Sequence, residues 1–180
     1  MDNKKTFWPI GIVLFLSIMV CMIILTVYIS IKSSPEDDNT YFSTRQIVDK
    51  EINHILLTQD QLEEEYKFYY IDNTGANHKL DRKVNKKTSI PIEIKTNEPF
   101  MLNIKITDNN GNNTDSAKVE SIITRFATSK FDKNLGELSK NNDIFKSNEI
   151  MLEKGDWKVM IKVTIDDKNA FFEQYIKVIE

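Results

Sequence analysis

The sequence predicts a single N-terminal transmembrane helix followed by a mainly β domain, an immunoglobulin-like antiparallel sandwich, with one amphipathic helix before it. Three observations predict this class. Residues 7–31 contain no charged side chain, residues 48–66 carry apolar side chains mostly at helical spacing, and from residue 67 on the apolar period changes to two. The 180-residue chain is 41% hydrophobic and 28% charged, an average that conceals this division.

The apolar run at residues 7–31 is long enough to cross a bilayer. Its helical length is roughly 37 Å, and a hydrocarbon core is about 30 Å thick. Pro9 falls in the first turn, where a missing N–H costs least, and Trp8 and Tyr28 stand near opposite ends, as interfacial aromatic residues do. A cleaved signal peptide would have a shorter apolar core followed by a small-x-small site, so we expect an uncleaved anchor.

The charges that flank the helix predict its orientation. Lys4 and Lys5 precede it, whereas Lys32 and an acidic stretch follow it, and positive flanks favour the cytoplasm. Residues 1–6 would then form a short cytoplasmic head. The remainder would lie in the periplasm, which makes the chain a single-pass protein of a bacterial inner membrane.

Residues 32–66 are expected to form a polar linker and an amphipathic helix. Ser43 and Gln46 have the spacing of a capping box at the start of a helix. The apolar side chains that follow form one stripe, which would face a core or a partner. This stripe consists of Val48, Ile52, Ile55, Leu56, Leu62 and Tyr66.

Residues 67–180 are expected to form the β domain, with about seven strands joined by polar turns. The expected strands are 68–71, 90–94, 100–106, 119–128, 144–152, 157–165 and 170–179. Residues 131–142 are expected to be irregular or briefly helical. Alternation is clearest in residues 157–165, where Ile161 should face the core and Lys162 the solvent. Short strands separated by turn signals are typical of a sandwich.

Charge and motifs restrict the function. The chain has a net charge of −3, and residues 1–32 carry +2, which leaves −5 for residues 33–180. A mildly acidic domain argues against nucleic acid, because binding to nucleic acid needs basic patches. The single cysteine excludes a disulfide framework, and no nucleophile elbow, zinc-binding helix motif, P-loop or dinucleotide fingerprint occurs. We therefore expect a protein that is not an enzyme and has no cofactor.

Two methionines are the weak candidates for a metal site. Thioether sulfur suits copper, and Met101 and Met160 fall on the outward phase of expected strands. If those strands were neighbours, the two sulfur atoms could approach each other. The more ordinary interpretation is that both residues fill surface contacts, as methionine commonly does, so no metal site is predicted.

The N-terminal third resembles the FixH (CcoH) family. Trp8 and Pro9 open the membrane helix, as a Trp-Pro pair does in that family. Tyr41 and Phe42 form an aromatic pair after the helix, where the family carries Tyr-Tyr.

Two segments of the expected β domain extend the resemblance. Gly155-Asp156-Trp157 introduces the last hairpin and is similar to the Gly-x-Trp strand of the family. The stretch from Thr124-Arg125-Phe126 to Asp132 is similar to its Arg-Pro-Thr…Asp segment, although the proline is absent here. The resemblance covers most of the chain as architecture, and its motifs are short.

The resemblance implies an assembly or stability factor for cbb₃-type cytochrome c oxidase that is not an enzyme. It implies contacts with oxidase subunits and with neighbouring copper-transport and maturation proteins, made through Trp8, Pro9, Tyr41 and Phe42. Simpler roles exist: Trp8 would anchor the helix at the interface, and Trp157 is expected in the core. Two other classes remain open, namely a membrane-tethered periplasmic module that binds a metal or ligand, and a structural or interaction subunit.

Overall fold

The structure, a computed structural model, describes residues 8–32, 45–114, 116–126 and 128–180, with the side chains of residues 45–50 and 129 left aside. Contacts divide the chain into two compact units, Met1–Glu36 and Asp37–Glu180, and each is described by itself. Tyr41 and Phe42, and Ser43 of the expected capping box, lie outside the described residues.

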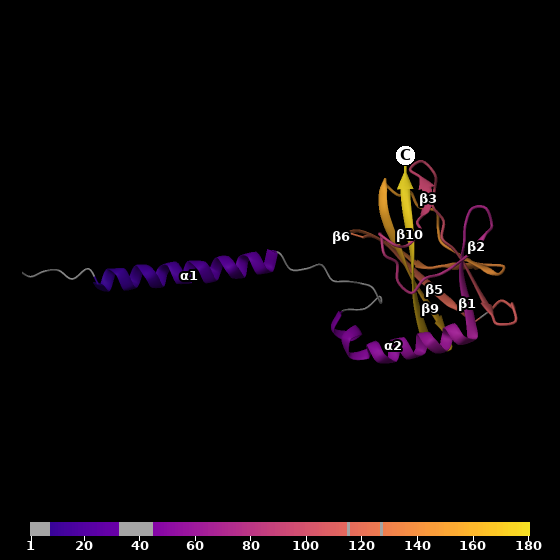
Figure 1. The fold of residues 1–180 in the computed structure, drawn as a ribbon, viewed down its shortest axis with the longest axis horizontal. Coiled ribbons are helices and arrows are strands. Elements are labelled where there is room, and N and C mark those ends of the chain that lie inside the picture. Colours follow the sequence, from indigo (N-terminus) through magenta and orange to yellow (C-terminus); the bar gives the residue numbers. More distant parts are fainter. Residues whose placement is uncertain (1–7, 33–44, 115, 127) are drawn as a thin grey trace, which may run out of the picture. The chain divides into compact units, whose positions relative to one another are not determined.

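The described part of the first unit is the helix α1, which spans Trp8–Lys32 (Figure 1). It is long and apolar enough to cross a membrane, as the sequence predicts. Two of its hydroxyl groups bond within the helix, from Ser17 to the carbonyl of Val13 at 2.9 Å and from Thr26 to the carbonyl of Met22 at 2.8 Å. Polar groups satisfied inside their own helix suit a hydrocarbon environment, because lipid offers them no partner.

The second unit begins its described part with the amphipathic helix α2, Arg45–Glu65. Of the expected apolar stripe, Leu62 packs in the core of the β domain and is 1% exposed, Ile52, Ile55 and Tyr66 are half-buried, and Leu56 is 40% exposed. Gln59 is also buried, and its amide bonds both backbone groups of Phe171, at 2.9 Å to the oxygen and 3.4 Å from the nitrogen. A side-chain amide thereby replaces a neighbouring strand at this point of the sheet edge, which otherwise would leave backbone groups unpaired.

Two five-stranded sheets follow α2 (Figure 1). The first sheet has the order β2 (Asn77–Lys79), β1 (Tyr66–Ile71), β4 (Asn103–Asp108), β8 (Ile144–Lys146) and β7 (Ser139–Asn141). The second sheet has the order β3 (Ile92–Lys95), β10 (Lys168–Ile179), β9 (Gly155–Ile165), β5 (Lys118–Arg125) and β6 (Thr128–Glu137). All neighbouring strands are antiparallel except β3 and β10, which are parallel.

The core lies between the two sheets. Phe68 of β1 and Phe172 of β10 meet across it, with ring centroids 4.6 Å apart. Trp157 is 1% exposed, which confirms its expected place in the core, and Ile161 is fully buried, while Lys162 pairs with Glu120 at 3.3 Å on the other face. The predicted phase of this strand is therefore confirmed.

One segment, residues 80–91, carries the chain from the first sheet to the second, and we name it the crossover segment. Leu80 still bonds the carbonyl of Phe68 in the first sheet, whereas the carbonyl of Asp81 accepts a 2.7 Å hydrogen bond from the Glu173 N–H in the second. The segment then returns to form β3. It covers part of the edge of β10 and thereby limits exposure of unpaired backbone groups.

The expectation for residues 131–142 is wrong. These residues belong mainly to β6 and β7. The short strand β2 was not expected either, so the described residues form ten strands rather than about seven. β6 is an edge strand whose pairing with β5 has two register irregularities, and Gly136 takes a φ of 68°. These irregularities interrupt the apolar alternation, which hides the strand in the sequence. The expected strand at 144–152 is shorter and ends at Lys146.

Candidate functional site

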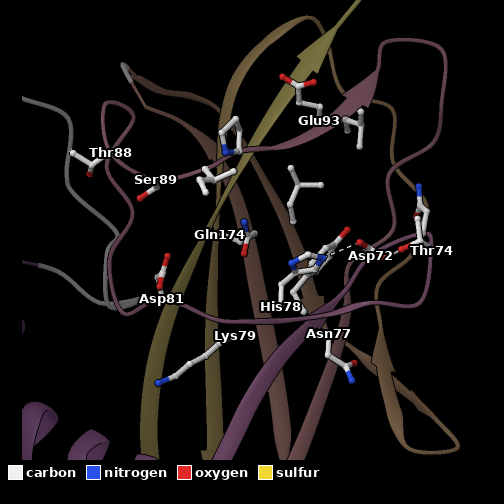
Figure 2. Close-up of a pocket in the computed structure, with 16 residues that line it drawn as sticks. Asp72, Thr74, Asn77, His78, Lys79, Asp81, Thr88, Ser89, Glu93 and Gln174 are labelled. Carbon is white, nitrogen blue, oxygen red and sulfur yellow. Dashed lines mark hydrogen bonds and ion pairs between the residues drawn. The ribbon is translucent and has the colours of Figure 1, made fainter.

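A groove of about 950 Å³ opens at the edge of the sandwich where the crossover segment passes between the sheets (Figure 2). The residues of β2 form one side and those of β3 form the other. Tyr70, Ile94 and Gln174 also line it, from β1, β3 and β10. The groove therefore collects residues that are far apart in the sequence, at a point where both neighbouring strands are the last in their sheets.

The turn after β1 builds one wall of the groove. The Asp72 carboxylate accepts hydrogen bonds from Thr74 N–H at 2.8 Å, Thr74 hydroxyl at 2.6 Å and Ala76 N–H at 3.0 Å, and His78 Nε2 lies 2.8 Å from its other oxygen (Figure 2). The hydrogen bonds from Thr74 and His78 hold the pKa of Asp72 well below its usual range. This carboxylate is thus a fixed, ionised structural group, and its oxygens are already occupied.

Tyr70 contributes a hydroxyl group to the groove. The residue is only 2% exposed, and burial, followed by the charge of Asp72, raises the pKa of Tyr70 to about 12. Within the described part of the chain this hydroxyl has no hydrogen-bond partner. A neutral hydroxyl that can both donate and accept is therefore left free beside the groove.

A buried ion pair fixes the crossover segment next to the groove. Glu173 is 3% exposed, and its carboxylate accepts hydrogen bonds from Lys158 Nζ at 2.9 Å and from the Val84 N–H at 2.8 Å. Arg82 of the same segment binds Asp60 and Glu63 of α2, both at 2.6 Å. Because a buried carboxylate needs several such partners, Glu173 determines where the segment crosses the sheet.

A second candidate feature lies near the edge of the second sheet opposite to β3, at β5 and β6. We name it the Arg125 cluster, and it consists of Arg125, Phe131, Glu153 and Trp157. The Arg125 guanidinium lies 4.5 Å from the ring centroid of Trp157 and 5.0 Å from that of Phe131, and it pairs with Glu153 at 3.0 Å. Phe131 is 49% exposed. A cation stacked between two aromatic rings gains an attraction that an isolated surface arginine lacks.

The backbone conformation and surroundings of position 155 explain why the Gly-x-Trp segment begins with a glycine. Gly155 adopts a φ of 136°, which side chains rarely allow, and a Cβ added there would approach Arg125 Nη1 to 3.2 Å. A side chain at position 155 would therefore crowd the guanidinium that stacks on Trp157. Arg125 and Trp157 are also directly paired across β5 and β9.

The two methionine candidates do not form a site. Met160 has the outward phase expected of it, on the face of β9 opposite to Ile161, but it is buried there, with 3% of its surface exposed. Met101 lies just before β4, in the first sheet. β9, which contains Met160, and β4, which follows Met101, are in different sheets and are therefore not neighbouring strands. Among the described residues, no group of three or more His, Cys, Asp and Glu side chains could hold a metal ion.

The structure places two of the four expected interaction residues. α1 begins at Trp8 with Pro9 in its first turn, and Trp8 is 76% exposed. At the other end, the Lys32 ammonium lies 6.0 Å from the ring centroid of Tyr28. Both aromatic residues therefore stand at helix ends with their surfaces free for an interface or a partner.

Sequence reasoning missed the groove and the ion pair beneath the crossover segment. One signal was available: Glu173 is a charged residue within the apolar run of β10. A carboxylate at such a position indicates a buried partner. The groove had no comparable signal, because it depends on the place where the chain changes sheets.

No known family model matches the chain, and no curated protein matches it. One solved structure with a detectable likeness is the crystal structure of an engineered protein, which is 6% identical. The match covers 52% of this chain and 19% of that chain, with a TM-score of 0.36. The chain thus spans about a fifth of that protein, and a likeness of this size carries no argument about fold or function.

Proposed function

We propose that the chain is a membrane-anchored assembly or stability factor for cbb₃-type cytochrome c oxidase, similar to FixH (CcoH) proteins, and that it acts through protein contacts. Its partners are oxidase subunits and neighbouring copper-transport and maturation proteins. It resides in a bacterial inner membrane, with the N-terminus in the cytoplasm and the β domain in the periplasm.

The Arg125 cluster is the observation that carries this proposal. The two short segments of the β domain that resemble the family are separated in the sequence by about thirty residues, yet Arg125 stacks directly on Trp157 and lies against Gly155. Two motifs that contact each other in the structure support a common origin with the FixH (CcoH) family better than two isolated matches do. The exposed ring of Phe131 gives this cluster a surface that a partner can contact.

The properties of α1 support the membrane part of the proposal. Its side chains are exposed throughout Trp8–Lys32, and within the described part of the chain nothing covers them. Exposed apolar surface of this extent marks a membrane or a protein contact. Lys4 and Lys5 before the helix favour a cytoplasmic N-terminus.

The immunoglobulin-like classification belongs to the proposal as well, and the strand order supports it. β1, β4, β8 and β7 follow one another as strands A, B, E and D do in one immunoglobulin sheet, and β10, β9, β5 and β6 follow one another as G, F, C and C′ do in the other. The parallel pairing of β3 with β10 is the departure from a purely antiparallel sandwich.

Deletion of the gene in its own host tests the function. We expect cbb₃-type oxidase to disappear from the membrane under low oxygen and to return when the wild-type chain is supplied. Unchanged oxidase levels would contradict the proposal. A reporter fused after Glu180 tests the orientation, because an alkaline phosphatase should be active there and a cytoplasm-dependent reporter inactive.

A membrane-tethered ligand-binding module is the second candidate, and the groove favours it. Its volume of about 950 Å³ lies within the usual range for small-molecule sites. A copper titration followed by the signals of Met101, Met160 and the histidines tests the metal-binding version of this candidate. The two methionines lie by different sheets, which gives that version little support.

A further inference from the structure

We infer that the groove between β2 and β3 binds an extended segment of a protein partner by strand addition. One apolar side chain of that segment would enter the groove towards Tyr70 and Ile94, and a Lys or Arg side chain would lie beside the exposed carboxylates of Asp81 and Glu93. The inference deepens the proposed function, because the choice of a protein as occupant rests on it. Strand addition supplies affinity through backbone hydrogen bonds and specificity through alternate side chains.

The two strands that border the groove both have an open edge. Among the described residues, β2 pairs only with β1, and β3 pairs only with β10. In β3 the Thr96 N–H bonds the carbonyl of Ile179, so even-numbered residues face β10 and the backbone groups of Glu93 point away from it. An added strand would find these groups free to bond.

The other two sheet edges are less suited to strand addition. β6 carries Lys130 and Lys133 and has two register irregularities with β5. β7 is three residues long, and all three are exposed. Lysines, irregular pairing and short length are the devices by which proteins protect an edge. The edges at the groove are also short, but they flank a cavity that an incoming side chain can enter.

The floor of the groove offers a mixed surface to that side chain. Ile94 is 7% exposed and Tyr70 is 2% exposed, which gives an apolar base. The free hydroxyl of Tyr70 adds one donor and one acceptor to this base. Gln174 stands at the same groove (Figure 2). Its Nε2 donates a hydrogen bond to the carbonyl of Tyr175 at 3.2 Å.

The charges of the lining select a basic partner. Asp81 and Glu93 supply two carboxylates, and Asp72 supplies a third whose oxygens are already bonded within its turn, against one ammonium group on Lys79 and the imidazole of His78, which is bonded to Asp72. Asp81 and Glu93 are exposed, so both are accessible from outside. Opposite charge steers association and suppresses acidic competitors.

Selection from a phage-displayed library of random eight-residue peptides, against the full chain in zwitterionic lipid nanodiscs, tests this inference. We expect enriched peptides to alternate apolar residues and to contain Lys or Arg. Fluorescence anisotropy with one enriched synthetic peptide then measures the variants. Glu93→Pro removes the edge N–H and the charge and should weaken binding about 10-fold, whereas Glu93→Gln should weaken it about 3-fold.

Two further variants separate binding from folding. Tyr70→Phe removes a hydroxyl that has no partner in the described chain, so it should leave thermal unfolding unchanged and weaken peptide binding about 3-fold. Asp143→Asn removes one exposed charge in the turn between β7 and β8 and should change neither quantity. It is the matched control for Glu93→Gln.

Three results would overturn the inference. The first is a selection without enrichment over empty nanodiscs, and the second is an enriched peptide whose affinity is the same for wild type, Glu93→Pro and Tyr70→Phe. The third is self-association of the chain that Glu93→Pro abolishes, which would give the groove to a second copy. If Glu93→Pro loses the peptide while oxidase accumulation stays normal, the strand-addition site stands and its use in oxidase assembly fails.

Discussion

α1 and the sandwich hold the same kinds of apolar side chain in opposite ways. In the sandwich, Ile161 and Val163 are fully buried between protein layers, whereas in α1 Ile24 is 63% exposed and Leu14 is also 63% exposed. The sandwich therefore supplies its own apolar environment, and α1 depends on what surrounds it. Substitutions in the sandwich should change folding first, and substitutions in α1 should change insertion or partner contacts first.

The largest expected effect comes from a charge in the core of the sandwich. Ile161→Asp should lower the free energy of unfolding by more than about 4 kcal/mol, because an unpaired carboxylate would lie between the sheets. Urea unfolding of the full chain in detergent, followed by near-ultraviolet circular dichroism, measures the change. Lys162→Gln should lower it by less than about 1 kcal/mol, since it removes only a partly exposed ion pair. Equal effects would mean that the assigned strand phase is wrong.

A matched change in α1 sharpens the comparison. Ile24→Ala should leave the unfolding transition of the β domain unchanged, because the two units are separate and each has its own contacts. A shift comparable to that of Ile161→Asp would contradict this division.

The buried ion pair should come next in size. Glu173→Ala leaves the Lys158 ammonium and the Val84 N–H without their carboxylate, and we expect a loss of about 3 kcal/mol in unfolding free energy. Glu153→Ala is the exposed counterpart, since its ion pair with Arg125 has a carboxylate side chain that is 75% exposed, and it should cost less than about 1 kcal/mol. Similar losses would remove the special role of Glu173 in fixing the crossover segment.

Gly155→Ala should cost about 2 kcal/mol, because alanine disfavours a φ of 136° and its Cβ would press on Arg125. In the Arg125→Ala background, Gly155→Ala should cost less, because the part of the loss that comes from the contact between its Cβ and Arg125 disappears. Complete disappearance of the loss in that background would mean that backbone conformation contributes nothing, contrary to the observed φ.

pH should produce the smallest effect, through the hydrogen bond from the Tyr175 hydroxyl to Asp156 at 2.5 Å. Burial, followed by Asp156, raises the pKa of Tyr175 to about 12 from 10.0. Its contribution to stability is therefore present below pH 10 and is lost as the pH rises towards 12. Lys86 and Tyr175 lower the pKa of Asp156, so its contribution is present above about pH 4 and is lost in more acidic solution.

Stability measured from pH 3 to 12 tests both signs. Tyr175→Phe should reduce the alkaline loss and leave the part due to Tyr70, whose pKa is also raised to about 12, and Asp156→Asn should make the acidic loss shallower. An unchanged alkaline profile in Tyr175→Phe would show that this phenol does not contribute.

The sequence predicted those elements whose apolar pattern is complete. α1 follows from an uncharged run, the burial of Leu62 in α2 from helical spacing, and β9 from strict alternation, whereas Leu56 of the expected stripe is 40% exposed. β6 was missed because a polar edge strand with irregular pairing has no period to detect. The groove could not be predicted for another reason: Tyr70, Glu93 and Gln174 come together only through the passage of the chain from one sheet to the other.

Replacement of residues 7–31 by an unrelated membrane helix tests the central claim, which is that the chain acts through contacts with oxidase subunits and that its helix takes part in them. Trp8 and Pro9 give the best match to the family, and a simple tether would need no such start. We expect the swapped protein to remain in the membrane with a folded β domain, while cbb₃-type oxidase activity under low oxygen falls to the level of the deletion strain. Normal oxidase activity in the swap strain would contradict recognition by the helix.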